Sequence, residues 1–236
     1  MRINRETFAR SLACLALAAL LVSTFGSLPV SAQAVTLDVD AATGTVHTGD
    51  SCPSPRDSAI YANIQAAVDC AVAGDTIDVA AGTYPEVVTI DKELTLLGAQ
   101  ADVEPVEGGR AGGESTIADP NPTSSGYTVI VNANDGAVNG FEIVDFYPAI
   151  DVRGPVGGTR SNVTLAYNNV HSTYAWSGIT IGHDPDAGVP SAGAGSFDTI
   201  NVTHNRIKAS ASDPSAPGPG YVNAELGFTN GFDTVT

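Results

Sequence analysis

The sequence predicts an all-β fold in which short strands stack into a solenoid behind one short helix. Three observations support this prediction: the hydrophobic period changes within residues 63–98, the segments between the alternating stretches are short, and later parts of the chain repeat one another. A crossover helix between parallel strands needs about a dozen connecting residues or more, so segments this short exclude that arrangement. We therefore expect the strands to form stacked turns of a solenoid.

The predicted helix covers residues 63–73. Its apolar residues fall at positions i, i+3, i+4 and i+7 and share one face: Ile64, Ala67, Val68 and Ala71. Asn63 stands at the N-cap position, and Gly74 stands where a glycine would end the helix. We expect this helix to bury its apolar face against the first strands.

Strands are predicted after Gly74, where apolar residues alternate with polar or small ones. The alternating pairs are Ile77 and Val79, Val88 and Ile90, and Leu94 and Leu96. The segments between them, Ala-Gly-Thr-Tyr-Pro at 81–85 and Asp-Lys-Glu at 91–93, have the composition of turns. Residues 99–125 are rich in Gly, Pro and Glu and are expected to form a long loop.

Four short blocks in this region resemble a known family. They are Ile-Gln-Ala-Ala-Val at 64–68, Gly-Asp-Thr-Ile-Asp-Val at 74–79, Gly-Thr-Tyr-Pro-Glu at 82–86 and Leu-Thr-Leu-Leu-Gly at 94–98. Together they are similar to the first coil of the right-handed parallel β-helix proteins of the pectate-lyase-like superfamily. The resemblance implies a right-handed parallel β-helix with a short N-terminal capping helix. It implies no particular activity, because these blocks build the end of the fold rather than a site.

An internal repeat gives further support for a solenoid. Residues 163–170 align with residues 200–207 at an offset of 37 residues, with apolar positions matching apolar positions. Asn168 and Asn205 occupy the same place in the two copies. We expect them to stack as an internal asparagine ladder at a turn, and the alternative is two independent surface turns.

The predicted organisation has three parts. Residues 1–34 have an arginine-containing start, an apolar run and a small-x-small site at Ala32-Gln33-Ala34, which are typical of a secretory signal peptide. Residues 35–62 form a polar leader, and residues 63–236 form the parallel β-helix, which we expect to be truncated at its C-terminus because the last repeat ends without a cap. The predicted location is secreted, extracellular or periplasmic, and no other run approaches the roughly 18 apolar residues of a membrane span.

Cys52 and Cys70 are the cysteines that remain outside the predicted signal peptide. In an exported chain, two cysteines indicate a single disulfide, which would tie the leader to the helix. A metal site made from these two thiols is the weaker alternative.

The charge balance restricts the choice of partner. The whole chain has 10 basic and 26 acidic residues; without the three arginines and one glutamate of the predicted signal, 7 basic residues face 25 acidic ones, a net charge of −18. A chain this acidic repels nucleic acids, anionic membranes and polyanions in general. A polysaccharide or an envelope glycan is the partner class that we expect.

Aromatic and histidine side chains are the candidates for carbohydrate contact. Aromatic faces pack against sugar rings, and histidines and phenols donate hydrogen bonds. The candidates are Tyr147, His171, Tyr174 and Trp176. The alternative is that these residues cover an otherwise open edge of a coil.

Two further groups are candidates for chemistry. Asp184 and Asp186 open an Asp-Pro-Asp-Ala-Gly segment that has the spacing with which a calcium loop begins, and a polar turn is the alternative. Calcium is the one cofactor that the sequence suggests. Pectate-lyase-type chemistry uses an arginine base near acidic calcium ligands, and Arg153 beside Asp151 and Asp145 is the candidate for it. An ion pair at the edge of a coil explains these residues equally well.

Three functional classes follow from these features. The first, which we favour, is a secreted or cell-surface module that binds carbohydrate or builds the cell envelope. The second is the N-terminal part of a polysaccharide lyase or glycoside hydrolase, although no persuasive pair of catalytic carboxylates stands out in this stretch. The third is a periplasmic metal-maturation β-helix protein, for which the chain is poor in Met, Cys and His ligands.

Overall fold

The computed structural model describes residues 33–121, 127–144, 148–155, 158–172, 177–182, 196–209 and 226–228. Within these ranges the chain forms sixteen strands and one α-helix, α2 (Ile64–Cys70). No helix in the described ranges is long and apolar enough to cross a membrane.

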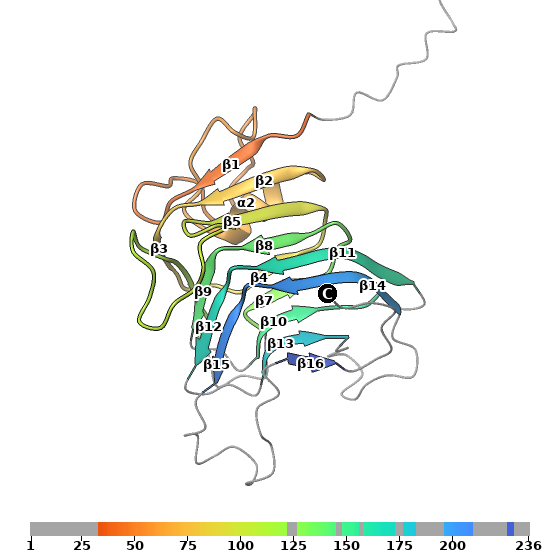
Figure 1. Ribbon diagram of the computed structural model, residues 1–236. Helices are drawn as coiled ribbons and strands as arrows, with labels where there is room; N and C mark the ends of the chain where they lie inside the picture. The colour runs from red at the N-terminus through yellow and green to blue at the C-terminus, as the bar shows by residue number, and fades with distance from the viewer. Residues whose placement is uncertain are drawn as a thin grey trace, which may run out of the picture. The chain divides into compact units, whose positions relative to one another are not determined.

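The strands form three parallel sheets, which we name A, B and C (Figure 1). Sheet A contains, in spatial order, β1 (Thr36–Val39), β2 (Asp75–Val79), β5 (Leu94–Gly98), β8 (Ala137–Asn139), β11 (Thr159–Ala166) and β14 (Ser196–Thr203). Sheet B contains β3 (Gly82–Tyr84), β6 (Ser115–Ala118), β9 (Phe141–Val144), β12 (Asn169–Ser172) and β15 (Arg206–Ala209). Sheet C contains β4 (Val88–Ile90), β7 (Val129–Val131), β10 (Pro148–Val152), β13 (Ser177–Ile181) and β16 (Leu226–Phe228).

From β2 onward the chain visits the sheets in a fixed rotation, A, then B, then C, five times. We call each passage a round, so that β2, β3 and β4 form the first round and β14, β15 and β16 the fifth. Each strand pairs in parallel with the strand of the next round in its own sheet, as β2 pairs with β5 and β3 with β6. This arrangement confirms the predicted all-β fold of parallel strands.

The register confirms the predicted repeat and shows where the rounds differ. Val163 pairs with Ile200 and Val170 with Ile207, which is the predicted offset of 37 residues. The offset is only 27 residues between Val138 and Leu165, one round earlier. Residues 182–195 connect β13 to β14, whereas only residues 153–158 connect β10 to β11, so most of the difference in length lies in the connection from sheet C back to sheet A.

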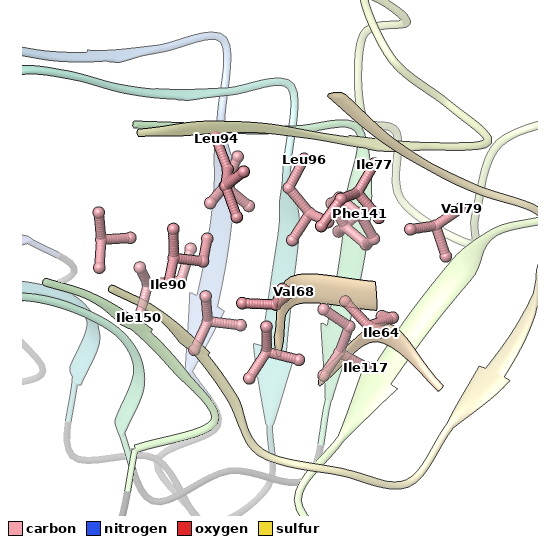
Figure 2. Close-up of a cluster of buried hydrophobic side chains, with 14 of the residues drawn as sticks. Ile64, Val68, Ile77, Val79, Ile90, Leu94, Leu96, Ile117, Phe141 and Ile150 are labelled. Carbon is pink, nitrogen blue, oxygen red and sulfur yellow. The ribbon is translucent and has the colours of Figure 1, made fainter. Parts of the chain in front are cut away.

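The interior is filled by alternate residues of the strands, as expected from the period of two. Side chains from α2 and from all three sheets point toward one another in one buried cluster (Figure 2). The cluster includes Ile64 and Val68 of α2 together with Ile77, Ile117 and Ile150 of the three sheets. The apolar face predicted for the helix is therefore buried against the early rounds.

The helix is shorter than the predicted segment 63–73. It ends at Cys70, and the backbone N–H of Ala71 donates to the carbonyls of Ala67 and Val68. The next N–H group, that of Val72, donates to the carboxylate of Asp75 instead of continuing the helix. Gly74 has a φ of +89° but does not directly follow the helix, so its predicted role as the helix terminator was wrong.

Strands also occur where the sequence indicated turns or a loop. The segment 81–85, predicted to be a turn, contains β3, and the segment 99–125, predicted to be a loop, contains β6. Tyr84 explains the first case, because its ring points into the core and its hydroxyl donates to the carbonyl of Ala80. The predicted leader likewise contains β1, which pairs with β2 at the end of sheet A.

The predicted disulfide is present. Cys52 and Cys70 are bonded, with their Cα atoms 5.4 Å apart. The bond joins the segment between β1 and α2 to the last residue of the helix. It closes a loop of 18 residues, which should contribute on the order of 3 kcal/mol by restricting the unfolded chain.

The buried Asp75 and its hydrogen-bond partners, which we call the N-terminal network, link β2 to the residues next to β1 and α2 and to Arg56. The carboxylate of Asp75 accepts hydrogen bonds from the backbone N–H groups of Val35 and Val72 and from two nitrogens of the Arg56 guanidinium. Its side chain is 0% exposed. Burial acts to raise the pKa of Asp75, but the hydrogen bonds from Arg56 and the backbone outweigh it, so the net pKa is lowered.

Glu86 caps the helix from a distance. Its two carboxylate oxygens accept the N–H groups of Ile64 and Gln65, at 2.8 and 2.9 Å, whereas the side chain of Asn63 makes no capping bond. Burial raises the pKa of Glu86, and the two N–H groups oppose that shift. The glutamate of the Gly-Thr-Tyr-Pro-Glu block therefore performs the task that the sequence assigned to Asn63.

The predicted asparagine ladder is confirmed. The side-chain Nδ2 of Asn168 donates to Oδ1 of Asn205 at 3.0 Å and to the carbonyl of Val138. Asn205 makes the equivalent bond one round later, from its Nδ2 to the carbonyl of Leu165. The two side chains thus satisfy backbone groups at the same corner of successive rounds, between sheets A and B.

Candidate functional site

Only some of the predicted site residues lie in the described ranges. The described ones are Asp151, Arg153 and His171, besides the disulfide. Asp145, Tyr147, Tyr174, Trp176, Asp184 and Asp186 lie outside the described residues. The predictions for carbohydrate contact, calcium and catalysis at those positions stay predictions. In the part of the chain that the structure describes, no group of three or more His, Cys, Asp or Glu residues is arranged to hold a metal ion.

Asp151 and Arg153 lie together on sheet C and just beyond it. The Arg153 Nε donates to Oδ2 of Asp151 at 2.9 Å, and the guanidinium carbon lies 5.6 Å from the centre of the Tyr127 ring. The Asp151 side chain is buried. Burial and the nearby Asp151 carboxylate raise the pKa of Tyr127, so its phenol keeps its proton.

This geometry has a direct consequence for the lyase prediction. An arginine that acts as a base must first lose its proton, and an ion pair with a carboxylate opposes that loss. The bond from Arg153 to Asp151 is therefore what we expect of a structural ion pair at the end of a strand. Its catalytic role with Asp145 and Asp151 remains a prediction.

A second group of polar residues lies on the outer face of sheet B. The inward side chains of this sheet, Ile117, Ile143 and Val170, are fully buried, so the residues between them face outward. Two outward rows result from the parallel register: Thr83, Thr116, Glu142, Asn169 and Arg206 form the first, and Ala118, Val144, His171 and Lys208 form the second.

Glu142 and His171 form the centre of this face. The Oε1 atom of Glu142 lies 2.9 Å from Nε2 of His171, and its Oε2 accepts the hydroxyl of Thr116 at 2.8 Å. The hydrogen bond with His171 lowers the pKa of Glu142, which is therefore ionised at neutral pH. The His171 side chain remains 40% exposed. A fixed carboxylate, an imidazole and a hydroxyl are thus available at one place on the surface.

The segment 99–114, which we call the strap, lies along the corner between sheets A and B. It leaves β5 and enters β6 (yellow-green loop in Figure 1). Its side chains nevertheless reach residues of three later rounds, namely Phe141, Tyr167 and Lys208. Each later round turns this corner with a residue of positive φ: Gly140 at 82°, Tyr167 at 54° and His204 at 55°. A Cβ atom on Gly140 would lie 2.2 Å from the backbone nitrogen of Ala101, so the strap requires glycine there.

Arg110 anchors the middle of the strap. Its side chain is 1% exposed and pairs with the Glu114 carboxylate at 2.7 Å. The remaining guanidinium hydrogens donate to backbone carbonyls, including that of Phe141 in the third round and that of Tyr167 at the corner of the fourth. A buried cation with this many acceptors holds the strap against the corner.

The outer part of the strap carries acidic residues that meet basic ones on the last described strand of sheet B. The Glu107 carboxylate accepts from Nζ of Lys208 at 2.7 Å and lies 3.7 Å from the Arg206 guanidinium. Glu104 pairs with Nδ1 of His204, whose ring stacks on Tyr167 at 4.6 Å between ring centres. The hydrogen bond from Lys208 lowers the pKa of Glu107.

Among the residues on the outer face of sheet B and in the strap, the sequence indicated one contact residue and missed the others. His171 was predicted as a contact residue, whereas Glu142, Lys208 and Glu107 were not. His171 lies 29 residues from Glu142, and Lys208 lies 101 residues from Glu107. The 37-residue repeat places His171 beside Lys208 and was the one signal in the sequence that could have related them.

No family model, curated protein or solved structure matches this chain.

Proposed function

We propose that this chain is a secreted or cell-surface module with a right-handed parallel β-helix fold of the pectate-lyase-like type, and that it binds carbohydrate through the outer face of sheet B. The fold assignment is supported by the fixed rotation through three parallel sheets and by α2 at the start of the first round. Export is supported by the Cys52–Cys70 disulfide and by the predicted signal peptide at residues 1–34.

The observation that carries the binding proposal is the group formed by Thr116, Glu142 and His171. Neighbouring strands of a sheet lie about 4.8 Å apart, so these side chains offer hydrogen-bonding groups on three successive strands of the outer face. The ionised carboxylate accepts from sugar hydroxyls, and bonds to a charged acceptor are stronger than neutral ones. The imidazole adds a group that accepts or donates according to its tautomer.

Binding to a panel of immobilised neutral and acidic polysaccharides tests this proposal. We expect wild-type protein to be retained by at least one of them, and we expect His171→Ala and Glu142→Gln to weaken that retention about tenfold or more. Thr95→Ala is the matched control, because Thr95 faces outward on sheet A, away from the proposed face. The proposal fails if the two variants are retained as well as the control.

The same experiment separates binding from catalysis. New reducing ends, or absorbance from unsaturated uronates, would assign the chain to the hydrolase or lyase class. Retention of the polysaccharide without turnover would assign it to the binding class. Retention that is independent of sheet B would favour a structural role in the envelope.

A further inference from the structure

We propose that Asn162 is a modification site that carries an N-linked glycan on the outer face of sheet A. The glycan is joined to the side-chain amide of Asn162, which lies on β11. This inference goes beyond the proposed function and does not depend on it, since it concerns sheet A, whereas binding is proposed for sheet B.

The sequence supplies the acceptor. Three segments of the chain read Asn-x-Thr, and they begin at Asn121, Asn162 and Asn201. In exported proteins, Asn-x-Ser or Asn-x-Thr is the acceptor sequence for N-glycosylation when the middle residue is not proline. Proline follows Asn121 and excludes that segment, whereas valine follows the other two asparagines. The Cys52–Cys70 disulfide and the predicted signal peptide support the export that this modification needs.

Asn162 lies in a bulge of β11. The ladder between β11 and β14 pairs Ser161 and Val163 with residues of β14 but skips Asn162 between them. The φ of Asn162 is +56°, which places it in the left-handed region. The residue is exposed to solvent, so its amide is accessible in the folded protein.

The bulge recurs at the same place in three successive rounds. Asp135 and Thr199, the equivalent residues on either side of Asn162, have φ values of 54° and 55°. Both are exposed as well. A glycan is bulky and hydrophilic. On Asn162 it leaves the molecule between short polar side chains that already face solvent, so it displaces nothing from the core.

The contact that Asn162 makes is compatible with the modification. Its Nδ2 atom carries two hydrogens, and it donates to Oδ1 of Asp135 at 2.9 Å. Transfer from a lipid-phosphate-linked oligosaccharide forms a bond between Nδ2 and the anomeric carbon of the first sugar. The bond from that carbon to the phosphate oxygen of the donor breaks, the lipid phosphate leaves with the electron pair, and the amide loses one proton. The remaining N–H can still donate to Asp135.

The second acceptor sequence has a different setting. Val163 is fully buried, so Thr164 faces outward on the side where Asn162 is exposed. Asn201 pairs in register with Thr164 and is half-buried in the regular part of β14. A glycan on Asn201 would lie over the neighbouring side chains of the sheet. The geometry therefore favours Asn162 over Asn201.

Backbone conformation offers a second explanation for Asn162. Asparagine tolerates a positive φ better than most residues, so the bulge alone could account for it. Thr164 separates the two explanations, because its hydroxyl completes the acceptor sequence but is not needed for the φ of Asn162.

The test is production of the full chain in a eukaryotic secretory cell line, followed by mass spectrometry of the protein recovered from the medium and the secretory membranes. We expect a glycan on Asn162 that a peptide N-glycosidase removes. Thr164→Ala should lose this glycan, and Thr164→Ser should keep it, because serine also completes the acceptor sequence. Asn201→Gln is the matched control and should leave the glycan on Asn162 unchanged.

An unmodified Asn162 in the recovered wild-type protein would overturn the proposal. A glycan on Asn162 that persists in Thr164→Ala would also overturn it. Occupancy at Asn201 equal to or above that at Asn162 would show that exposure in the bulge does not select the site. Thermal unfolding of Thr164→Ala and Thr164→Ser shows that loss of the glycan is not caused by loss of the fold. Polysaccharide retention does not enter any of these outcomes, so failure of the proposed function leaves this inference intact.

Discussion

The ion pair of the first round, Arg56–Asp75, and the ion pair between the strap and the fifth round, Lys208–Glu107, differ in their exposure to solvent. Asp75, in the N-terminal network, is buried and accepts two backbone N–H groups besides Arg56. Glu107, in the strap, is largely exposed and accepts one hydrogen bond, from Lys208. The same carboxylate chemistry therefore stabilises the fold at one end and remains available for exchange at the other, because burial decides how much is lost when a partner leaves.

The largest effect is expected from Asp75→Ala. The change leaves the Arg56 guanidinium and two backbone N–H groups without their buried acceptor, and breaking a buried pair costs about 3–5 kcal/mol. Asp78→Ala is the control, because Asp78 lies on the same strand but is exposed, and we expect it to change the free energy of unfolding by less than about 0.5 kcal/mol. Urea unfolding of both variants measures the difference.

The contribution of Asp75 should also depend on pH. Its folded pKa lies below the ordinary value of 3.8, so the stabilisation is fully present above that pH and is lost as the pH falls through the folded pKa. The difference in unfolding free energy between wild type and Asp75→Asn should therefore stay constant from neutral pH to about pH 5 and shrink at lower pH. A difference that grows on acidification would contradict this sign.

Removal of the disulfide is expected to have the next largest effect. Replacing Cys52 and Cys70 by serine frees a loop of 18 residues in the unfolded chain and should cost about 3 kcal/mol. A reducing agent should destabilise the wild type by a similar amount. It should leave the double serine variant unchanged, and a response of that variant to the reductant would contradict the assignment.

A smaller effect is expected from Glu86→Ala. Two N–H groups in the first turn of α2 lose their acceptor, and loss of a helix cap costs about 1–2 kcal/mol. Glu93→Ala removes an exposed glutamate from the next turn of the chain and serves as the control. Equal unfolding midpoints for the two variants would show that Glu86 does not cap the helix.

The smallest effect on stability is expected from Glu107→Gln. Its carboxylate is exposed, so the urea midpoint should stay close to that of the wild type even though the contact with Lys208 is lost. A fall comparable with that of Asp75→Ala would remove the contrast between the two ends. Raising the salt concentration should likewise affect the strap contacts before it affects the N-terminal network.

The sequence predicted those parts of the fold that depend on local period. Alternation at Ile77, Val88 and Leu94 identified β2, β4 and β5. β3 was missed because Gly82 and the proline after Tyr84 have turn composition, and pairing with β6 decides its structure instead. β6 was hidden for a similar reason, since it begins with Ser115, a polar residue that is buried because its hydroxyl donates to the backbone of β2.

The candidate site was less predictable than the fold. His171 can be recognised as a candidate from its residue type, but its position and its hydrogen bond depend on Glu142 in the neighbouring strand. The pairing of Glu107 with Lys208 depends on the strap crossing several rounds, which no local pattern encodes. Register and loop course are tertiary properties, so composition and spacing alone do not determine them.

The capping of α2 by Glu86 makes the first round a cooperative folding unit. A helix of seven residues is too short to be stable by itself in water, and its leading N–H groups find their acceptor only after the chain has passed through β2 and β3. Helix formation and closure of the first round should therefore occur in one step. The completed round then offers unpaired strand edges on which the second round can assemble, so folding of the described chain is expected to proceed from its N-terminal end.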